Sequence, residues 1–152
     1  GRPAKQWRLT EHADPMFPDR HADLAVSLID SLKGAFGPTG MQRLLEQRAA
    51  DQIKAYRRRL PKGATWQRRV RALAKLRSEE GYMAQALREA DGSMLLIENH
   101  CPICFAAKAC SGLCSNELDV FTAVLGKSVS IERTEHMLEG SRRCAYRVTR
   151  AR

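Results

Sequence analysis

Residues 81–104, GYMAQALREADGSMLLIENHCPIC, decide the fold because the hydrophobic period of the chain changes within them. Short apolar runs at 82–89 and 94–98 flank Asp91-Gly92, a dipeptide typical of the tight turn in a β-hairpin. The sequence therefore predicts two antiparallel strands here, followed at once by a segment rich in cysteine.

The segment after this hairpin predicts a helix and a second hairpin. Residues 102–126 have helical periodicity with a break near Ser111, and strands are expected at 129–137 and 144–148 around a turn at Gly140. The order β-β-α-β-β, with helices in front of it, predicts an α+β fold. In this fold a small antiparallel sheet is accompanied by a helix that carries cysteines.

Upstream of this region the apolar residues recur with helical spacing. Three helices are predicted, over 20–36, 40–60 and 66–80. Gly37-Pro38 and Pro61 are the breaks between them. The first two helices carry broad apolar stripes, which we expect to form the two-fold interface of a homodimer.

Positive charge is concentrated in the middle of the chain. The net charge is +9, and the 24 residues from Lys54 to Arg77 include ten basic residues and no acidic one. This window indicates a polyanionic partner, with DNA the leading candidate and a solvated, arginine-rich helix face the alternative. In the third helix, Val70 and Leu73 are expected to face inward. The basic residues expected to face largely outward are Arg68, Arg69, Arg71, Lys75 and Arg77.

The composition argues against several classes of protein. The sequence has no run of 18 or more apolar residues, and its first residues lack the apolar region of a secretory signal. We therefore expect a soluble, cytoplasmic protein with no membrane partner. No Ser/His/Asp set, phosphate-binding loop or pair of carboxylates occurs in a pattern typical of a hydrolase, so enzymatic activity is not expected.

All five cysteines follow residue 100, at the spacing Cys101-x2-Cys104-x5-Cys110-x3-Cys114-x29-Cys144. The odd count and the absence of an export signal argue against a disulfide framework. Clustered thiols in a reducing compartment more often bind metal or perform redox chemistry, and thiolates are ligands of zinc and of iron–sulfur clusters. The spacing matches neither a paired zinc ribbon nor the ferredoxin pattern, so by itself it leaves the metal open.

Three of the cysteines lie at the ends of predicted elements. Cys101 precedes Pro102 at the expected start of a helix, where backbone amides and the helix dipole lower the pKa of a thiol. Cys114 lies at the expected helix break, and Cys144 begins the last strand. Ligands spread over such elements can meet only in the folded chain, which couples metal binding to conformation.

The remaining candidates are less specific. Cys104 and Cys110 have apolar neighbours and are explained equally well as small buried side chains. Imidazole can complete a site formed by three thiolates, and the two nearby histidines are His100 and His136. A histidine on a strand is more often structural, so this ligand assignment stays open.

Several segments, taken in order, resemble the SufR-type regulators, which repress iron–sulfur assembly operons. Each segment is short, but their joint order over essentially the whole chain is specific. The segments are ENHCPIC (98–104), LCSNEL (113–118), ERTEH (132–136) and GSRRCAYRV (140–148), preceded by GRP (1–3), WRLT (7–10), FPDRHA (17–22) and EEGYM (79–83).

The resemblance implies a winged helix-turn-helix followed by helices and a C-terminal cluster-binding domain. GRP leading into WRLT resembles the tip and second strand of the wing, so the chain is expected to begin inside the wing and to bind operator DNA poorly by itself. The implied division is a wing remnant and linker at 1–18, a helical dimerisation or linker region at 19–80, and a cysteine-rich sensor domain at 81–152.

The resemblance also implies metal ligands. The cluster ligands of the family fall on Cys101, Cys114 and Cys144, whereas a further cysteine of the cyanobacterial pattern is replaced here by Ser128. His136 is the first choice for the fourth ligand, because the vinyl-4-reductase-type sensor domain, which the Cys144 end resembles, has a ligand eight positions before its last cysteine. The other candidates are Cys104, Cys110, His100 and an external thiolate.

These features together predict a dimeric transcriptional repressor of iron–sulfur cluster assembly genes. A bound cluster, with [4Fe–4S] favoured, would control its affinity for DNA. Two alternatives remain open, a zinc-binding sensor of a ligand and a thiol-based redox switch formed by Cys101 and Cys104.

Overall fold

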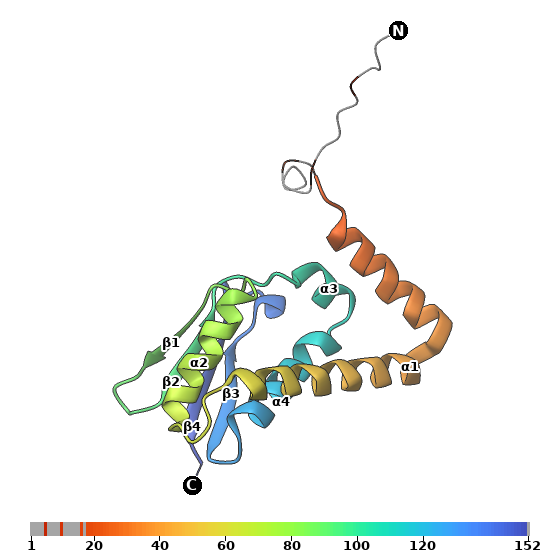
Figure 1. The fold of residues 1–152 in the computed structure, drawn as a ribbon. Helices are drawn as coiled ribbons and strands as arrows, with labels where there is room; N and C mark the ends of the chain where they lie inside the picture. The colour runs from red at the N-terminus through yellow and green to blue at the C-terminus, as the bar shows by residue number, and fades with distance from the viewer. Residues whose placement is uncertain (1–4, 6–9, 11–15, 17, 152) are drawn as a thin grey trace.

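The computed structural model describes Lys5, Thr10, Met16 and residues 18–151 (Figure 1). Residues 7–9 of the predicted wing strand at 7–10 therefore lie outside the described residues. No helix in the described part of the chain is both long enough and apolar enough to cross a membrane.

The first two predicted helices form α1 (His21–Arg59), which bends sharply between them (Figure 1). At the bend Gly37 has φ 63° and ψ −170°, a conformation that costs glycine little. Pro38 begins the second half, where its fixed φ and missing N–H suit a first helical position. Leu60 is extended, as the residue before a proline must be, and ends the helix. The predicted breaks are confirmed.

The third predicted helix is α2 (Trp66–Glu79). Thr65 caps it, because its side-chain oxygen accepts a hydrogen bond from the backbone N–H of Arg68. Val70 and Leu73 are completely buried, as predicted. Arg77 is completely buried as well, so the prediction that it faces outward is wrong.

The remaining elements form the predicted α+β fold. The sheet has the strand order β1-β2-β4-β3, and every neighbouring pair is antiparallel (Figure 1). Its strands are β1 (Ala84–Arg88), β2 (Met94–Glu98), β3 (Val129–Glu135) and β4 (Cys144–Arg150). Two helices, α3 (Cys104–Ala109) and α4 (Gly112–Leu125), lie between β2 and β3 in sequence, with the break close to Ser111 as predicted. A short 3-10 helix, η2 (Met137–Glu139), connects β3 to the turn before β4.

The helices cover one face of the sheet. α2 packs against β1 and β2, and α4 packs against β3. The two central strands bring buried residues into register on this face, where Met94 lies opposite Val148 and Leu96 opposite Tyr146. Phe121 of α4 meets the Tyr146 ring edge-on, with the ring centroids 5.1 Å apart. The same face continues toward the cysteines, because the next pair in register is Glu98 and Cys144.

The N-terminal half of α1 leaves this core and exposes its apolar stripe. Leu24, Leu28 and Phe36 are 57%, 54% and 65% exposed, respectively. The half-helix contacts the rest of the chain through α3, where Lys33 Nζ donates a hydrogen bond to the carbonyl of Ala109 at 2.5 Å. The stripe predicted as a dimer interface is therefore available on the surface of the single chain.

Candidate metal centre

The three predicted cysteine ligands come from three different parts of the fold. Cys101 lies in the turn between β2 and α3, Cys114 in the first turn of α4, and Cys144 is the first residue of β4. α3 begins at Cys104 and not at Pro102, so the prediction that Cys101 directly precedes a helix is wrong. The reason is local, since the carbonyl of Cys101 accepts the N–H of Cys104 and forms a turn before the helix.

Burial controls the chemistry of these thiols. It raises the pKa of Cys101 to about 11 and that of Cys114 to about 12, and it also raises the pKa of Cys144. A backbone N–H from Ile103 lowers the pKa of Cys101, but by less than burial raises it. The expected lowering of the Cys101 pKa by a helix start is therefore wrong, and all three groups are neutral thiols at neutral pH.

The three thiols lie within electrostatic range of one another. The thiolate charges of Cys101 and Cys144 each raise the pKa of Cys114, and that of Cys144 also raises the pKa of Cys101. Among the described residues, however, no group of three or more cysteine, histidine or acidic side chains is close enough together to hold a metal ion. The fold thus gathers the three predicted thiols into one neighbourhood without forming a ligand shell.

His136 lies beside Cys144 at the end of the β3–β4 ladder, one residue beyond the pair Glu135–Ala145. The N–H of the following residue, Met137, donates to Cys144 Sγ at 3.5 Å. The His136 side chain is 12% exposed, and both of its ring nitrogens are buried without a hydrogen-bond partner. Nδ1 lies 3.2 Å from Glu139 Oε1, but this contact lacks hydrogen-bond geometry and the glutamate is largely exposed.

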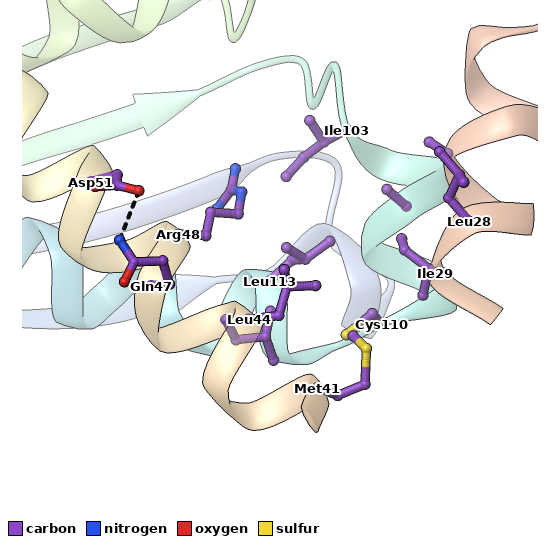
Figure 2. Close-up of a pocket in the computed structure, with 13 residues that line it drawn as sticks. Leu28, Ile29, Met41, Leu44, Gln47, Arg48, Asp51, Ile103, Cys110 and Leu113 are labelled. Carbon is purple, nitrogen blue, oxygen red and sulfur yellow. Dashed lines mark hydrogen bonds between the residues drawn. The ribbon is translucent and has the colours of Figure 1, made fainter. Parts of the chain in front are cut away.

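The other candidates for the fourth ligand differ in their placement. His100 is exposed, whereas Cys104, at the start of α3, is half-buried as Cys101 is, and its thiolate charge raises the pKa of Cys101. Cys110 lines an apolar cavity of about 550 Å³ between α1 and α3, where its side chain points toward that of Met41 (Figure 2). Ser128 directly precedes β3, and its carbonyl accepts the N–H of Ala151 beyond β4. A seven-residue strand separates Ser128 from the end of the sheet where Cys144 lies, so position 128 cannot supply a ligand beside Cys144.

A buried charge network that the sequence did not predict lies beneath the thiols. Arg77 Nε donates to Glu98 Oε1 at 2.6 Å, its Nη2 contacts Glu117, and its Nη1 donates to the Tyr56 hydroxyl at 3.2 Å. The guanidinium also lies 3.3 Å from the centroid of the Tyr82 ring. A signal was present in the sequence, because Arg77 follows Val70 and Leu73 at the i+7 and i+4 positions of the buried stripe.

This network reaches the cysteine site through two carboxylates. Glu98 is paired with Cys144 across the β2–β4 ladder, and Glu117 lies one helical turn beyond Cys114. Burial, reinforced by the charge of Glu117, raises the pKa of Glu98, although the hydrogen bond from Arg77 opposes this shift. Glu117 Oε2 also accepts a hydrogen bond from the Tyr146 hydroxyl at 2.6 Å. The thiols therefore lie next to two acidic side chains, Glu98 and Glu117.

No protein-family model and no curated protein sequence matches this chain. The donor set is then the basis for assigning a function. Three thiolates and one imidazole form a zinc set, and three thiolates with one further ligand suit an iron–sulfur cluster. Among the described residues, four buried side-chain nitrogens have no hydrogen-bond partner, and three of them belong to Arg133 and His136 beside this site. By donor chemistry the three thiols and the His136 imidazole suit a metal group, although the side chains as placed are not close enough together to bind one.

Proposed function

We propose that this chain is the sensor part of a transcriptional repressor of iron–sulfur cluster assembly genes, in which the state of a bound cluster controls the affinity for DNA. Cys101, Cys114 and Cys144 would hold the cluster, with [4Fe–4S] favoured, and His136 would supply the fourth ligand. When bound, the cluster supplies a redox- and oxygen-sensitive group. The sequence resemblance to SufR-type regulators favours iron–sulfur over other metals.

The unsatisfied imidazole of His136 carries this proposal. A buried polar group without a hydrogen bond costs free energy, about 1–3 kcal/mol by protein mutation, so such groups are rare unless something binds them. Both ring nitrogens of His136 are in this condition beside Cys144. A metal ion bound through one of these nitrogens would satisfy it.

The buried network gives the site a route to the helices. Tyr56 of α1 donates to Glu80 at 2.5 Å and accepts from Arg77, which in turn contacts both carboxylates beside the cysteines. A change in charge at the thiols would act electrostatically on Glu98 and Glu117, and through their contacts with Arg77 on α1 and α2. Such a network is one physical route by which a sensor site could be coupled to the helices.

The proposed partners are a second copy of the chain and DNA. The exposed leucines of α1 support a dimer, because contiguous apolar surface on a soluble protein commonly marks an interface. Lys54, Arg57, Arg58 and Lys62 line one shallow groove at the end of α1, which supports a contact with phosphates. Electrophoretic mobility shifts over a range of salt would test this contact, and binding that does not weaken as salt rises would contradict it.

The deciding experiment is anaerobic purification followed by measurement of iron, sulfide and zinc on the same sample. We expect brown protein with broad absorbance in the visible blue and a lower cluster content in Cys101→Ser and His136→Ala variants. Colourless protein with stoichiometric zinc would favour the zinc sensor, which the set of three cysteines and one histidine also suits. A reversible Cys101–Cys104 disulfide without metal would favour the redox switch.

A further inference from the structure

Arg133 of β3 contacts α4 and β4, the two elements that carry Cys114 and Cys144. Its Nη2 donates to the carbonyl oxygen of Cys114 at 2.5 Å and lies 4.0 Å from Glu117 Oε2 and 3.5 Å from the Tyr146 hydroxyl. The guanidinium carbon lies 5.3 Å from the centroid of the Tyr146 ring. The side chain is 17% exposed, and its Nε is buried without a hydrogen-bond partner.

The charges around the thiols are unevenly distributed. Burial is the main cause that raises the pKa of Cys114 and Cys144, and Glu117 raises both further, as Glu98 does for Cys144. Among the groups that act on these two thiols, Arg133 is the cation, and it lowers the pKa of each. The other buried cation of this region, Arg77, is engaged by Glu98 and Glu117.

Binding of a divalent metal ion makes such a site more negative. Three neutral thiols release three protons and one ion of charge +2 enters, so the net charge of the site changes by −1. With both carboxylates ionised, Glu98 and Glu117 are balanced by Arg77 and Arg133. Without Arg133, the thiolate–metal group would form next to an uncompensated negative charge in a medium of low dielectric constant.

We propose that Arg133 is a positioning residue for the metal centre, which fixes the Cys114 turn through the carbonyl oxygen and compensates the negative charge that the thiolates acquire when metal binds. The inference rests on the proposed function only in requiring that these thiols bind metal. It holds equally for zinc and for an iron–sulfur cluster, because each is bound by anionic thiolates.

The test uses Co²⁺ as the probe, added under anaerobic conditions to the metal-free chain. Thiolate-to-cobalt charge-transfer absorbance reports binding, and competition with a chelator gives the affinity. We expect Arg133→Gln to weaken binding by about 10- to 100-fold and Arg133→Lys, which keeps the charge, by clearly less. The matched control is Arg147→Gln, because Arg147 also lies in the sheet but is half-exposed and pairs with Asp91.

Each outcome bears on a different claim. Equal affinity of the wild-type chain and a folded Arg133→Gln variant would overturn the role of Arg133 and leave the proposed function intact. Absence of charge-transfer absorbance in the wild-type chain would overturn both. If Arg133→Gln does not fold, Arg133→Lys decides: binding close to that of the wild type supports charge compensation, and a loss as large as 10-fold in a folded protein contradicts it.

Discussion

The N-terminal half of α1 exposes apolar side chains, whereas the interior beneath the cysteines buries charged ones. The half-helix exposes leucines that would normally form a core, and the interior encloses Arg77 with two carboxylates. In each region the single chain leaves something incomplete, apolar surface in the first and buried ring nitrogens of His136 in the second. This difference underlies our proposal of two kinds of partner, another protein surface for α1 and a metal ion for the interior.

Replacement of Arg77, the cation buried beneath the cysteines, should have the largest effect on the stability of the folded chain. Arg77→Met removes the partner of Glu98 and Glu117 and leaves two carboxylates buried together. We expect the free energy of unfolding to fall by about 3–5 kcal/mol, the cost of breaking a buried ion pair on one side. Urea denaturation of the metal-free chain measures it. Arg71→Met, on the exposed face of the same helix, is the control, and equal losses in both variants would contradict a special role for Arg77.

Acidification should weaken metal binding steeply. The pKa values of Cys101 and Cys114 lie near 11 and 12 and that of Cys144 is raised, so all three thiols are protonated at neutral pH and must lose protons to bind. The affinity should therefore fall by about three powers of ten for each pH unit lowered, equivalent to about 4 kcal/mol. Cobalt titrations between neutral and mildly alkaline pH measure the slope. A slope near one proton would mean that one thiol binds, not three.

Mutation should distinguish the proposed metal ligands from the other cysteines by the effect on cobalt affinity. Cys114→Ala removes a proposed ligand, whereas Cys110→Ala changes a thiol that lines the apolar cavity beside Met41 (Figure 2). We expect the first to lower cobalt affinity by about 100-fold or more, beyond the usual effect of an outer-shell residue, and the second to leave it within about 2-fold. Chelator competition on both variants gives the ratio, and the reverse order would place the metal at α3.

The sequence predicted the positions of helices, strands and turns better than it predicted which side chains the folded chain would bury. The bend at Gly37, the end of α1 before Pro61 and the Asp91-Gly92 turn depend on neighbouring residues alone, and each is present in the structure. The burial of Arg77 depends on Glu98, Glu117 and Tyr82, which lie far away along the chain. No local pattern contains that information, although the position of Arg77 in an apolar stripe hinted at it.

The same limit applies to the thiol site. The spacing identified the candidate cysteines, but whether a thiol is acidic depends on how far the folded chain buries it. Cys101 illustrates this, because burial outweighs the backbone N–H that stabilises its anion. His136 was selected by resemblance, whereas its unsatisfied nitrogens became visible only once η2 and β4 were packed around it.

The exposed half of α1 should give the smallest effect, and one confined to assembly. Leu28 is 54% exposed, so Leu28→Glu should change the unfolding free energy of the monomer by less than about 0.5 kcal/mol. In a dimer formed through this stripe, the same change should weaken association by about 10-fold or more, because it places a charge in an apolar interface. Sedimentation velocity over a concentration series measures this weakening of association.

Ser31→Glu, at an exposed polar position in the same half-helix, is the control. A wild-type chain that stays monomeric at high concentration would contradict the proposed dimer, and equal weakening by both variants would show that helix charge, not the leucine stripe, governs association.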